Sequence, residues 1–213
     1  MSAPTSISAE ARAHLRRSDP VMKGIVDRVG DLSFSVDPDL WRSLVASIVG
    51  QQLSVAAART IRGRVAALSP DGFPDPELLL ATSEETLRGC GLSRAKLAYL
   101  QDLAQRWQRG EIDPAALREL PDEEVIQRLS AVKGIGRWTA EMVLIFSMNR
   151  PDVLAVDDLG IRSAVQKGYG LRERPDKEEL LRIGEVWRPF RSYASLYLWK
   201  SLKKEKIVSA SEG

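Results

Sequence analysis

The chain has 213 residues, and its 31 lysines and arginines nearly balance its 29 aspartates and glutamates, so the formal net charge is only +2. A chain of this length can bury a substantial apolar core, and its bulk charge does not by itself indicate a nucleic-acid partner. The single cysteine, Cys90, and the single histidine, His14, exclude an internal disulfide framework and most zinc chemistry.

The distribution of apolar and charged residues predicts a soluble protein. The first residues do not place a basic region before an apolar run, and no stretch approaches about eighteen uninterrupted apolar residues. We therefore expect no membrane association and a cytoplasmic location, at the nucleoid if the protein is bacterial. Local positive charge lies in Arg62 with Arg64, in Lys133 with Arg137 and in the tail from Lys200 to Lys206, although solvated helix faces carry the same pattern.

Helix signals recur along the chain, whereas runs of alternating β-branched residues are missing, so the predicted fold class is all-α. In chain order, helix starts are expected at Ser8, Asp19–Pro20, Asp37–Pro38, Ser54, Ser83, Ser93, Pro114 and Pro121. An apolar helix covers Met142 to Phe146, and three further helical patterns cover 158–167, 177–186 and 190–204. Proline and glycine at 69–72 interrupt the regular pattern.

Two glycines, Gly134 and Gly136, bracket one apolar residue between two predicted helices. Glycine lets the backbone approach another molecule closely, and the N–H groups that open a helix favour an anion. The motif therefore predicts a phosphate site. A phosphate bound there would hold a nucleic-acid strand at a fixed distance from the two carboxylates that follow the helix, Asp157 and Asp158.

Several motifs occur in an order that is typical of one family. They are Gln51-Gln52, Gly-Ile-Gly-Arg-Trp at 134–138, Asp157-Asp158, and Trp-Arg-Pro-Phe-Arg-Ser-Tyr-Ala at 187–194 with Trp199. In this combination the chain strongly resembles the helix-hairpin-helix (HhH-GPD) DNA glycosylase superfamily, and within it the AlkA-like 3-methyladenine DNA glycosylases. The resemblance covers about residues 38–205.

The resemblance implies a two-lobed helical fold with an active-site cleft between the lobes and no β-domain. It divides the chain into N-terminal helices at 1–37, a central lobe at 38–150 with the hairpin at about 129–148, and a C-terminal segment at 151–213. The N-terminal helices are expected to pack with the C-terminal lobe.

One aspartate can suffice for cutting the bond between a base and its deoxyribose. The sugar becomes cationic as the base departs, and a carboxylate beside C1′ stabilises that charge. An alkylated purine already carries positive charge and leaves as a neutral base, so no matched acid is needed. The resemblance assigns this role to Asp158. Asp157 stays an alternative, because lyase relatives place their aspartate in a sequence that aligns with Val156-Asp157, and one of the two aspartates could merely cap the helix at Leu159.

The bifunctional relatives carry a lysine where this chain has Trp138, so the resemblance implies a monofunctional hydrolase without a Schiff base. It also places Trp138 and Trp199 in the base pocket, whereas spacing alone favours a core role for each. Met142 and Leu159 stand where relatives often have tyrosines. A wider pocket and a broader range of alkylated bases are therefore expected.

The resemblance further implies that Gln52, with Leu53, enters the DNA stack when the base is flipped. A plainer alternative is that Gln51 or Gln52 only caps or spans helices. By the same resemblance, the DNA backbone is bound by the hairpin residues Lys133, Gly134, Ile135, Gly136, Arg137 and Thr139. The main-chain carbonyls of Ser130, Val132 and Ile135 would hold a monovalent Na⁺ or K⁺, and no other cofactor is expected.

Together these features predict a monofunctional DNA glycosylase that releases alkylated bases, such as 3-methyladenine and 7-methylguanine, from double-stranded DNA and starts base excision repair. This is a hydrolase of the DNA-3-methyladenine glycosylase II type, and we expect it to act as a monomer. Two alternatives stay open: a helix-hairpin-helix protein that binds DNA without chemistry, and a bifunctional glycosylase and lyase for oxidised bases.

Overall fold

The computed structural model describes residues 4–70 and 72–208, the last six of these by their backbone alone. The chain divides into two compact units. The residues before Asp37 and those from Leu144 onward form one unit, and Asp37–Val143 form the other. None of the described helices combines the length and the apolar character that a membrane span requires. The basic tail expected at 200–206 lies mostly outside the side chains that are described.

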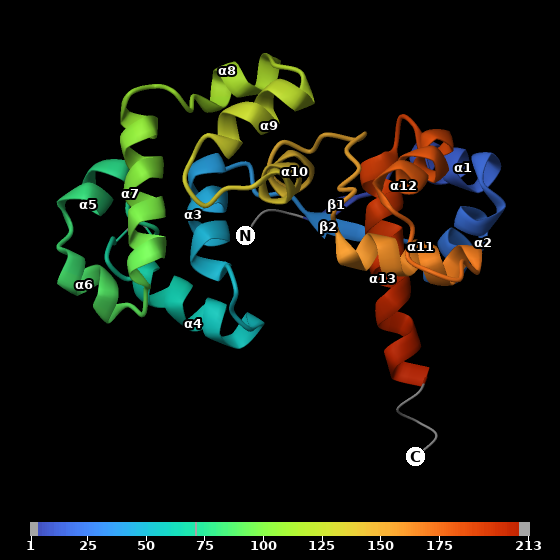
Figure 1. Cartoon of the computed structure of the whole chain (residues 1–213), viewed down its shortest axis with the longest axis horizontal. Helices are drawn as coiled ribbons and strands as arrows, with labels where there is room; N and C mark the ends of the chain where they lie inside the picture. Colours follow the sequence, from blue (N-terminus) through green and yellow to red (C-terminus); the bar gives the residue numbers. More distant parts are fainter. Residues whose placement is uncertain (1–3, 71, 209–213) are drawn as a thin grey trace. The chain divides into compact units, whose positions relative to one another are not determined.

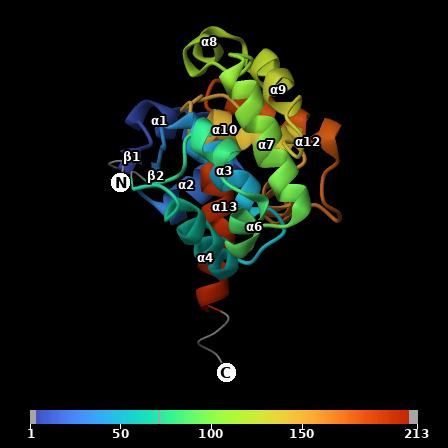
Figure 2. The same ribbon diagram turned by 90° about the vertical axis from the view of Figure 1, so that its left-hand side faces the viewer.

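The first unit combines the two ends of the described chain. It contains β1 (Pro4–Ser6), α1 (Ala9–Ser18), α2 (Pro20–Val29), β2 (Ser33–Ser35), α11 (Leu159–Tyr169), α12 (Lys177–Gly184), the short 3-10 helix η1 (Glu185–Trp187) and α13 (Arg191–Val208). Helix α13 packs against α2 and α11, and β1 pairs antiparallel with β2 in the register Pro4 to Ser35 (Figures 1 and 2). The N-terminal helices thus share a core with the C-terminal helices.

Asp19 connects three elements of this unit. Its side chain caps α2 by accepting hydrogen bonds from the amides of Val21 and Met22, at 2.8 and 3.2 Å. The other carboxylate oxygen accepts from the indole N–H of Trp187 at 2.8 Å and from the hydroxyl of Tyr169. Burial, followed by the hydrogen bond to Asp19, raises the pKa of Tyr169 well above its usual range. This buried polar cluster holds α2, the end of α11 and η1 together.

In its described part, the second unit is built from helices joined by turns and loops. It contains α3 (Leu40–Gly50), α4 (Val55–Ala66), α5 (Pro76–Ala81), α6 (Glu84–Gly89), α7 (Arg94–Gln108), α8 (Pro114–Glu119), α9 (Asp122–Ser130) and the first turns of α10 (Arg137–Phe146). Helix α7 packs on α3, α5 and α6. The rings of Trp41 and Trp107 meet edge to face at 5.1 Å, and the indole of Trp41 donates to the Pro74 carbonyl at 2.9 Å.

The all-α prediction is confirmed, with a two-stranded sheet as the only strand pairing among the elements of the described chain. Five predicted capping residues do cap helices: Ser8, Asp19, Ser54, Ser83 and Ser93. The start predicted at Asp37–Pro38 is wrong by two positions, because Asp39 accepts the hydrogen bond from the Arg42 amide at 3.0 Å and Asp37 accepts from the Asp39 amide instead. The first unit resumes at Leu144, within α10, whereas the sequence placed that limit at 150.

Candidate active site and nucleic-acid interface

Asp158 is a buried carboxylate with a fixed orientation. It is the N-cap of α11 and is only 9% exposed. Its Oδ1 accepts one hydrogen bond from the Ile161 amide and another from the indole N–H of Trp199, each at 2.8 Å. The amides at a helix N-terminus favour a negative charge, and the indole donor adds to this effect. The capping role that the sequence left open for one of the two aspartates thus falls on Asp158.

Gly160 leaves the space in which the indole reaches the carboxylate. A Cβ atom at this position would lie 3.0 Å from Asp158 Oδ1 and 3.0 Å from Cδ1 of Trp199. A side chain here would push the carboxylate or the indole aside by a few tenths of an ångström. The sequence contains a signal for this packing, because an isolated glycine within a helical pattern is less favourable than alanine and often has a packing reason.

Asp157 has a different environment. Its side chain is 40% exposed and forms an ion pair with the Lys177 ammonium at 2.8 Å. Exposed ion pairs of this kind are screened by water and contribute little electrostatic energy. The two neighbouring aspartates therefore differ in burial and in hydrogen-bond donors, which the sequence could not distinguish.

The aromatic and apolar residues assigned to the base pocket differ in exposure. Trp199 is half-buried, and its ring stacks with that of Phe146 at a centroid distance of 6.0 Å and an interplanar angle of 25°. Trp138 is 46% exposed and Leu159 is 61% exposed, although both are large apolar side chains. Met142 is partly buried. Trp138 and Leu159 therefore expose apolar surface that is accessible to a ligand.

The hairpin between α9 and α10 is fixed by close packing at Gly134. This glycine has a φ of +80°, and a Cβ there would lie 2.2 Å from Cδ2 of Tyr99 on α7. By contrast, a Cβ on Gly136 would meet nothing within 4 Å. The protein's own packing thus explains Gly134 but not Gly136. The exposed Gly136 lies immediately before the first turn of α10, where the amides of a helix attract anions.

Asp102 anchors the hairpin to α7. Its carboxylate accepts a hydrogen bond from the Lys133 amide at 2.9 Å and another from Nε of Arg106 at 3.0 Å. Burial alone would raise the pKa of Asp102, but the Lys133 amide and Arg106 outweigh it and the pKa lies below its ordinary value. The backbone of Lys133 is therefore held in place while its side chain is exposed.

The remaining hairpin residues assigned to DNA binding offer their backbone rather than their side chains. The side chains of Ile135 and Thr139 are buried, at 3% and 7% exposure. The guanidinium of Arg137 donates twice to Glu123, at 2.8 Å each, and once to Glu141 at 3.1 Å. The bond to Glu123 is the largest cause that raises the pKa of Arg137, and it lowers the pKa of Glu123. Within this unit, Arg137 clamps α9 to α10.

The turn between α3 and α4 is exposed and is tied to the hairpin. Gln52 has a φ of +54°, a left-handed conformation that is strained by about 1 kcal/mol or more in a residue other than glycine. Gln51 donates from Nε2 to the Gly134 carbonyl at 2.7 Å. The ammonium of Lys96 donates to the carbonyls of Val49 and Gln51 at 2.8 and 2.7 Å, and burial lowers its pKa. The helix-spanning role that the sequence left open thus belongs to Gln51, whereas Gln52 is exposed.

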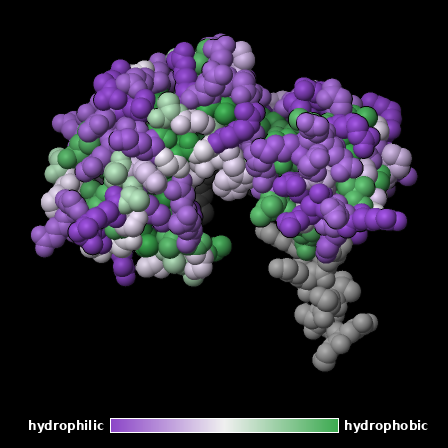
Figure 3. Space-filling model, viewed as in Figure 1, coloured by the Kyte–Doolittle hydropathy of each residue, from purple (hydrophilic) through white to green (hydrophobic). Residues whose placement is uncertain are grey.

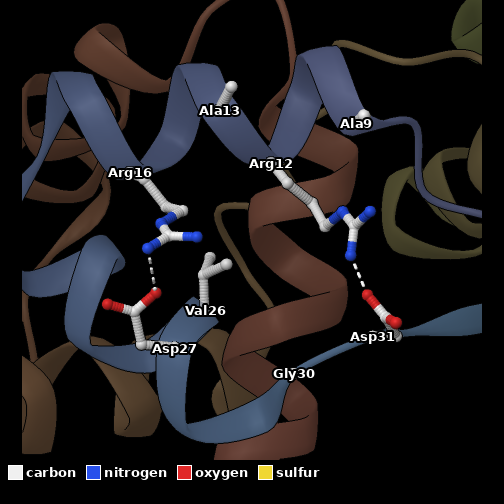
Figure 4. Close-up of a pocket in the computed structure, with 8 residues that line it drawn as sticks. All are labelled: Ala9, Arg12, Ala13, Arg16, Val26, Asp27, Gly30 and Asp31. Atoms are coloured by element: carbon white, nitrogen blue, oxygen red, sulfur yellow. Dashed lines mark hydrogen bonds and ion pairs between the residues drawn. The ribbon is translucent and has the colours of Figure 1, made fainter.

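Two cavities of the first unit are lined by residues other than those assigned to chemistry. Figure 4 shows one of about 390 Å³, in which Arg12 points to Asp31 and Arg16 points to Asp27. The Arg16–Asp27 pair is 3.0 Å long. Each of these arginines is already neutralised by a carboxylate, so this cavity offers no unpaired charge to an anion. The described residues also contain no cluster of histidine, cysteine, aspartate or glutamate that could hold a metal ion.

Comparison with known proteins adds a family and relatives to this geometry. The family described as "HhH-GPD superfamily base excision DNA repair protein" matches residues 45–189. "DNA-3-methyladenine glycosylase 1" of Schizosaccharomyces pombe is 38% identical over 199 residues, which are 91% of this chain and 87% of the relative.

Two solved structures are similar along most of their length. One is the Schizosaccharomyces pombe 3-methyladenine DNA glycosylase in complex with abasic DNA, with a TM-score of 0.81, 37% identity and coverage of 90% of this chain and 96% of that one. The other is a DNA-3-methyladenine glycosidase from Bacillus halodurans, with a TM-score of 0.84, 36% identity and coverage of 93% and 92%.

Proposed function

Because the chain belongs to the HhH-GPD superfamily of base excision DNA repair proteins, we propose that it is a monofunctional DNA glycosylase that releases alkylated bases from double-stranded DNA. The proposed substrates include 3-methyladenine and 7-methylguanine, which makes the protein a hydrolase of the DNA-3-methyladenine glycosylase II type. The names of the relatives support the alkylated-base substrate. The proposed active form is a monomer.

The observation that carries this proposal is the buried carboxylate of Asp158, held by the Ile161 amide and the Trp199 indole. A preorganised negative charge is most useful where positive charge develops in the transition state, which here is the deoxyribose as its base departs. Asp157 lacks this arrangement, because its charge is paired with Lys177 at the surface. We therefore assign the catalytic role to Asp158.

In the proposed reaction the C1′–N bond breaks first, and the base leaves with the bonding electron pair. An N-alkylated purine is cationic before this step and neutral after it, so no acid has to protonate the leaving group. Water then forms the new bond to C1′ and releases a proton to the solvent, which leaves an abasic site. Trp138 offers no amine for a Schiff base, so the strand is expected to stay intact.

Recognition of the base is proposed to depend on stacking. The exposed ring of Trp138 and the half-buried ring of Trp199 would attract a flipped cationic base by about 0.5–2 kcal/mol each. Met142 and Leu159 add apolar surface without further rings. We propose that this composition broadens the range of accepted alkylated bases.

Binding of the duplex is proposed to use two features of the second unit. The backbone around Gly136 and the first turn of α10 would take a phosphate, with Lys133 close by in sequence. Gln52, held in its strained conformation, would fill the gap that the flipped base leaves, with Leu53 beside it.

We propose a monovalent cation at the hairpin and no organic cofactor. The main-chain carbonyls of Ser130, Val132 and Ile135 would hold this cation. The Val132 carbonyl accepts one hydrogen bond, from the Ile135 amide at 3.0 Å, and a carbonyl has a second lone pair for a cation. Crystals grown with Rb⁺ should show an anomalous peak next to these three oxygens. A map without such a peak would contradict the assignment.

Incubation with a methylated duplex tests the function as a whole. Chromatography should show free 3-methyladenine and 7-methylguanine, and the strand should break only after alkali or heat. Release of no base at all would favour a protein that binds DNA without chemistry. Strand cleavage without alkali or heat would favour a lyase.

A further inference from the structure

The second unit contains a long segment without negative charge. Residues 40–70 include the arginines Arg42, Arg59, Arg62 and Arg64 and no aspartate or glutamate. Arg42 pairs with Asp37 at 3.4 Å. The other three lie on α4, their side chains are exposed, and no carboxylate of the described chain forms an ion pair with them. Elsewhere in the unit Arg106, Arg109 and Arg137 have carboxylate partners, whereas Arg88, Arg94 and Arg128 on other helices form no ion pair with a described carboxylate.

Two of these arginines share a face of α4 with an exposed apolar residue. Positions 55, 59 and 62 are spaced by four and three residues, so Val55, Arg59 and Arg62 lie on one side of the helix. Val55 is 88% exposed, more than any other large apolar side chain that is exposed in the described part of the chain. We call Val55, Arg59 and Arg62 the α4 face. Figure 3 shows pale and green residues along the lower edge of the unit, where Figure 1 draws α4.

The α4 face begins next to the turn that carries Gln52. The guanidinium of Arg62 lies against Gly50, since a Cβ on that glycine would be 3.2 Å from Nη2 of Arg62. Arg64, two residues later, points elsewhere: one of its Nη atoms lies 3.9 Å from the Cβ position of Gly91, at the turn between α6 and α7. The charge beside the Gln52 turn therefore comes from Arg59 and Arg62 and not from Arg64.

We propose that the α4 face binds the phosphate backbone of duplex DNA beside the Gln52 turn, as a second phosphate contact in addition to the hairpin. Arginine recognises phosphate through two parallel N–H donors, and an arginine without a carboxylate partner loses no ion pair when it does so. Val55 provides apolar contact to the sugar edge. This inference rests on the proposed function, because it needs DNA as the ligand. It adds a phosphate contact that carries no information on the damaged base.

The salt dependence of binding measures phosphate contacts directly. Each phosphate that a protein neutralises contributes about 0.9 to the slope of log K against log salt concentration. Binding would be measured by fluorescence anisotropy with the full chain, on an undamaged duplex and on one with a tetrahydrofuran abasic analogue, between about 50 and 300 mM KCl. The double variant Arg59→Gln/Arg62→Gln should lower the slope by about 2, and equally on both duplexes.

Two control variants make the result specific. Glutamine and arginine have similar helix propensities, so α4 should persist in each variant, which circular dichroism can check. Arg64→Gln removes the same charge from the other side of α4, and Arg109→Gln removes an arginine that Glu111 already pairs at 2.6 Å. Both should keep the slope of the wild type.

The outcomes separate the inference from the proposed function. An unchanged slope in the double variant, with normal binding by the wild type, would overturn the α4 face alone. The inference would also be overturned if Arg64→Gln lowered the salt-dependence slope by as much as the loss of one α4-face arginine does. The change in net charge would then explain the effect. A wild-type chain that binds neither duplex would overturn the proposed function, and the α4 face with it.

Discussion

The indole N–H of Trp199 donates a hydrogen bond of 2.8 Å to Oδ1 of Asp158, across 41 positions of sequence. The contact joins the middle of α13 to the start of α11. It orients the one buried carboxylate that the proposed reaction uses, and it depends on the absence of a side chain at Gly160. Trp199 thereby combines the ring that we propose for base stacking with an N–H donor for the carboxylate.

Trp199→Phe tests the donor separately from the ring. Phenylalanine keeps an aromatic face but removes the N–H, and a hydrogen bond to a charged group is worth about 1.5–3 kcal/mol. The single-turnover rate of base release should fall by about tenfold to a hundredfold, while the Kd for abasic duplex should change by less than about threefold. A rate equal to that of the wild type would show that the indole does not orient Asp158.

The two hairpin glycines should respond in opposite ways to alanine. Gly134→Ala forces a methyl group into the Tyr99 ring at a positive φ, so the free energy of unfolding should fall by about 2–4 kcal/mol. Gly136→Ala meets open space, so the free energy of unfolding should change by less than about 0.5 kcal/mol.

The same Gly136→Ala variant should bind abasic duplex about tenfold more weakly, because the methyl group stands where a phosphate would approach. Urea denaturation and anisotropy titration measure the two effects. If the Gly136→Ala protein is stable and binds DNA as the wild type does, the proposal that the hairpin backbone contacts DNA is contradicted.

Gln51 should control how the Gln52 turn is positioned. Gln51→Ala removes the hydrogen bond to the Gly134 carbonyl, which is worth about 0.5–1.5 kcal/mol. We expect a rate of base release up to about tenfold lower, and a weaker fluorescence increase from 2-aminopurine placed next to the lesion, which reports unstacking. Gln51→Glu replaces the donor by a carboxylate that faces the Gly134 carbonyl, so the rate of base release and the fluorescence increase should fall further than in Gln51→Ala. Equal fluorescence in all three proteins would mean that this bond does not position the turn.

Asp102 should make the hairpin sensitive to acid. Its folded-state pKa lies below the ordinary value of 3.8, so the unfolded chain takes up this proton first as the pH falls. The stabilisation is complete above about pH 4 and is lost as the pH falls through the folded-state pKa. Asp102→Asn should therefore lower the free energy of unfolding by about 1–2 kcal/mol at pH 7 and by clearly less at pH 3.

Urea denaturation at the two pH values measures this difference, with Glu119→Gln as an exposed-carboxylate control that should change little. An equal effect of Asp102→Asn at pH 7 and at pH 3 would contradict the assigned role of Asp102.

Local signals in the sequence predicted local structure well. Serine and aspartate caps such as Ser54 and Ser93 satisfy amides only three residues away, so the signal and the interaction lie in one short segment. The same locality explains the error at Asp37, where Asp39 competes as a cap. The short strands β1 and β2 were missed because three-residue segments carry no alternating pattern.

The contacts that define the candidate site could not be predicted because they join distant segments. Three of these contacts depend on how helices pack. They are the hydrogen bonds of Trp199 with Asp158, of Gln51 with Gly134 and of Arg137 with Glu123. A basic residue in a motif looks the same whether a carboxylate or a phosphate faces it. The cleft expected between the lobes and the roles of the base-pocket residues stay predictions.

The most direct test of the account compares two single variants in the rate of 3-methyladenine release from duplex DNA under single-turnover conditions. Asn caps helices as well as Asp and keeps an acceptor for the Trp199 indole, so Asp158→Asn removes the charge alone. The account predicts a rate at least about a hundredfold lower for Asp158→Asn and within about threefold of the wild type for Asp157→Asn, with similar Kd values for abasic duplex. Wild-type release by Asp158→Asn, or its loss in Asp157→Asn, would contradict the assignment.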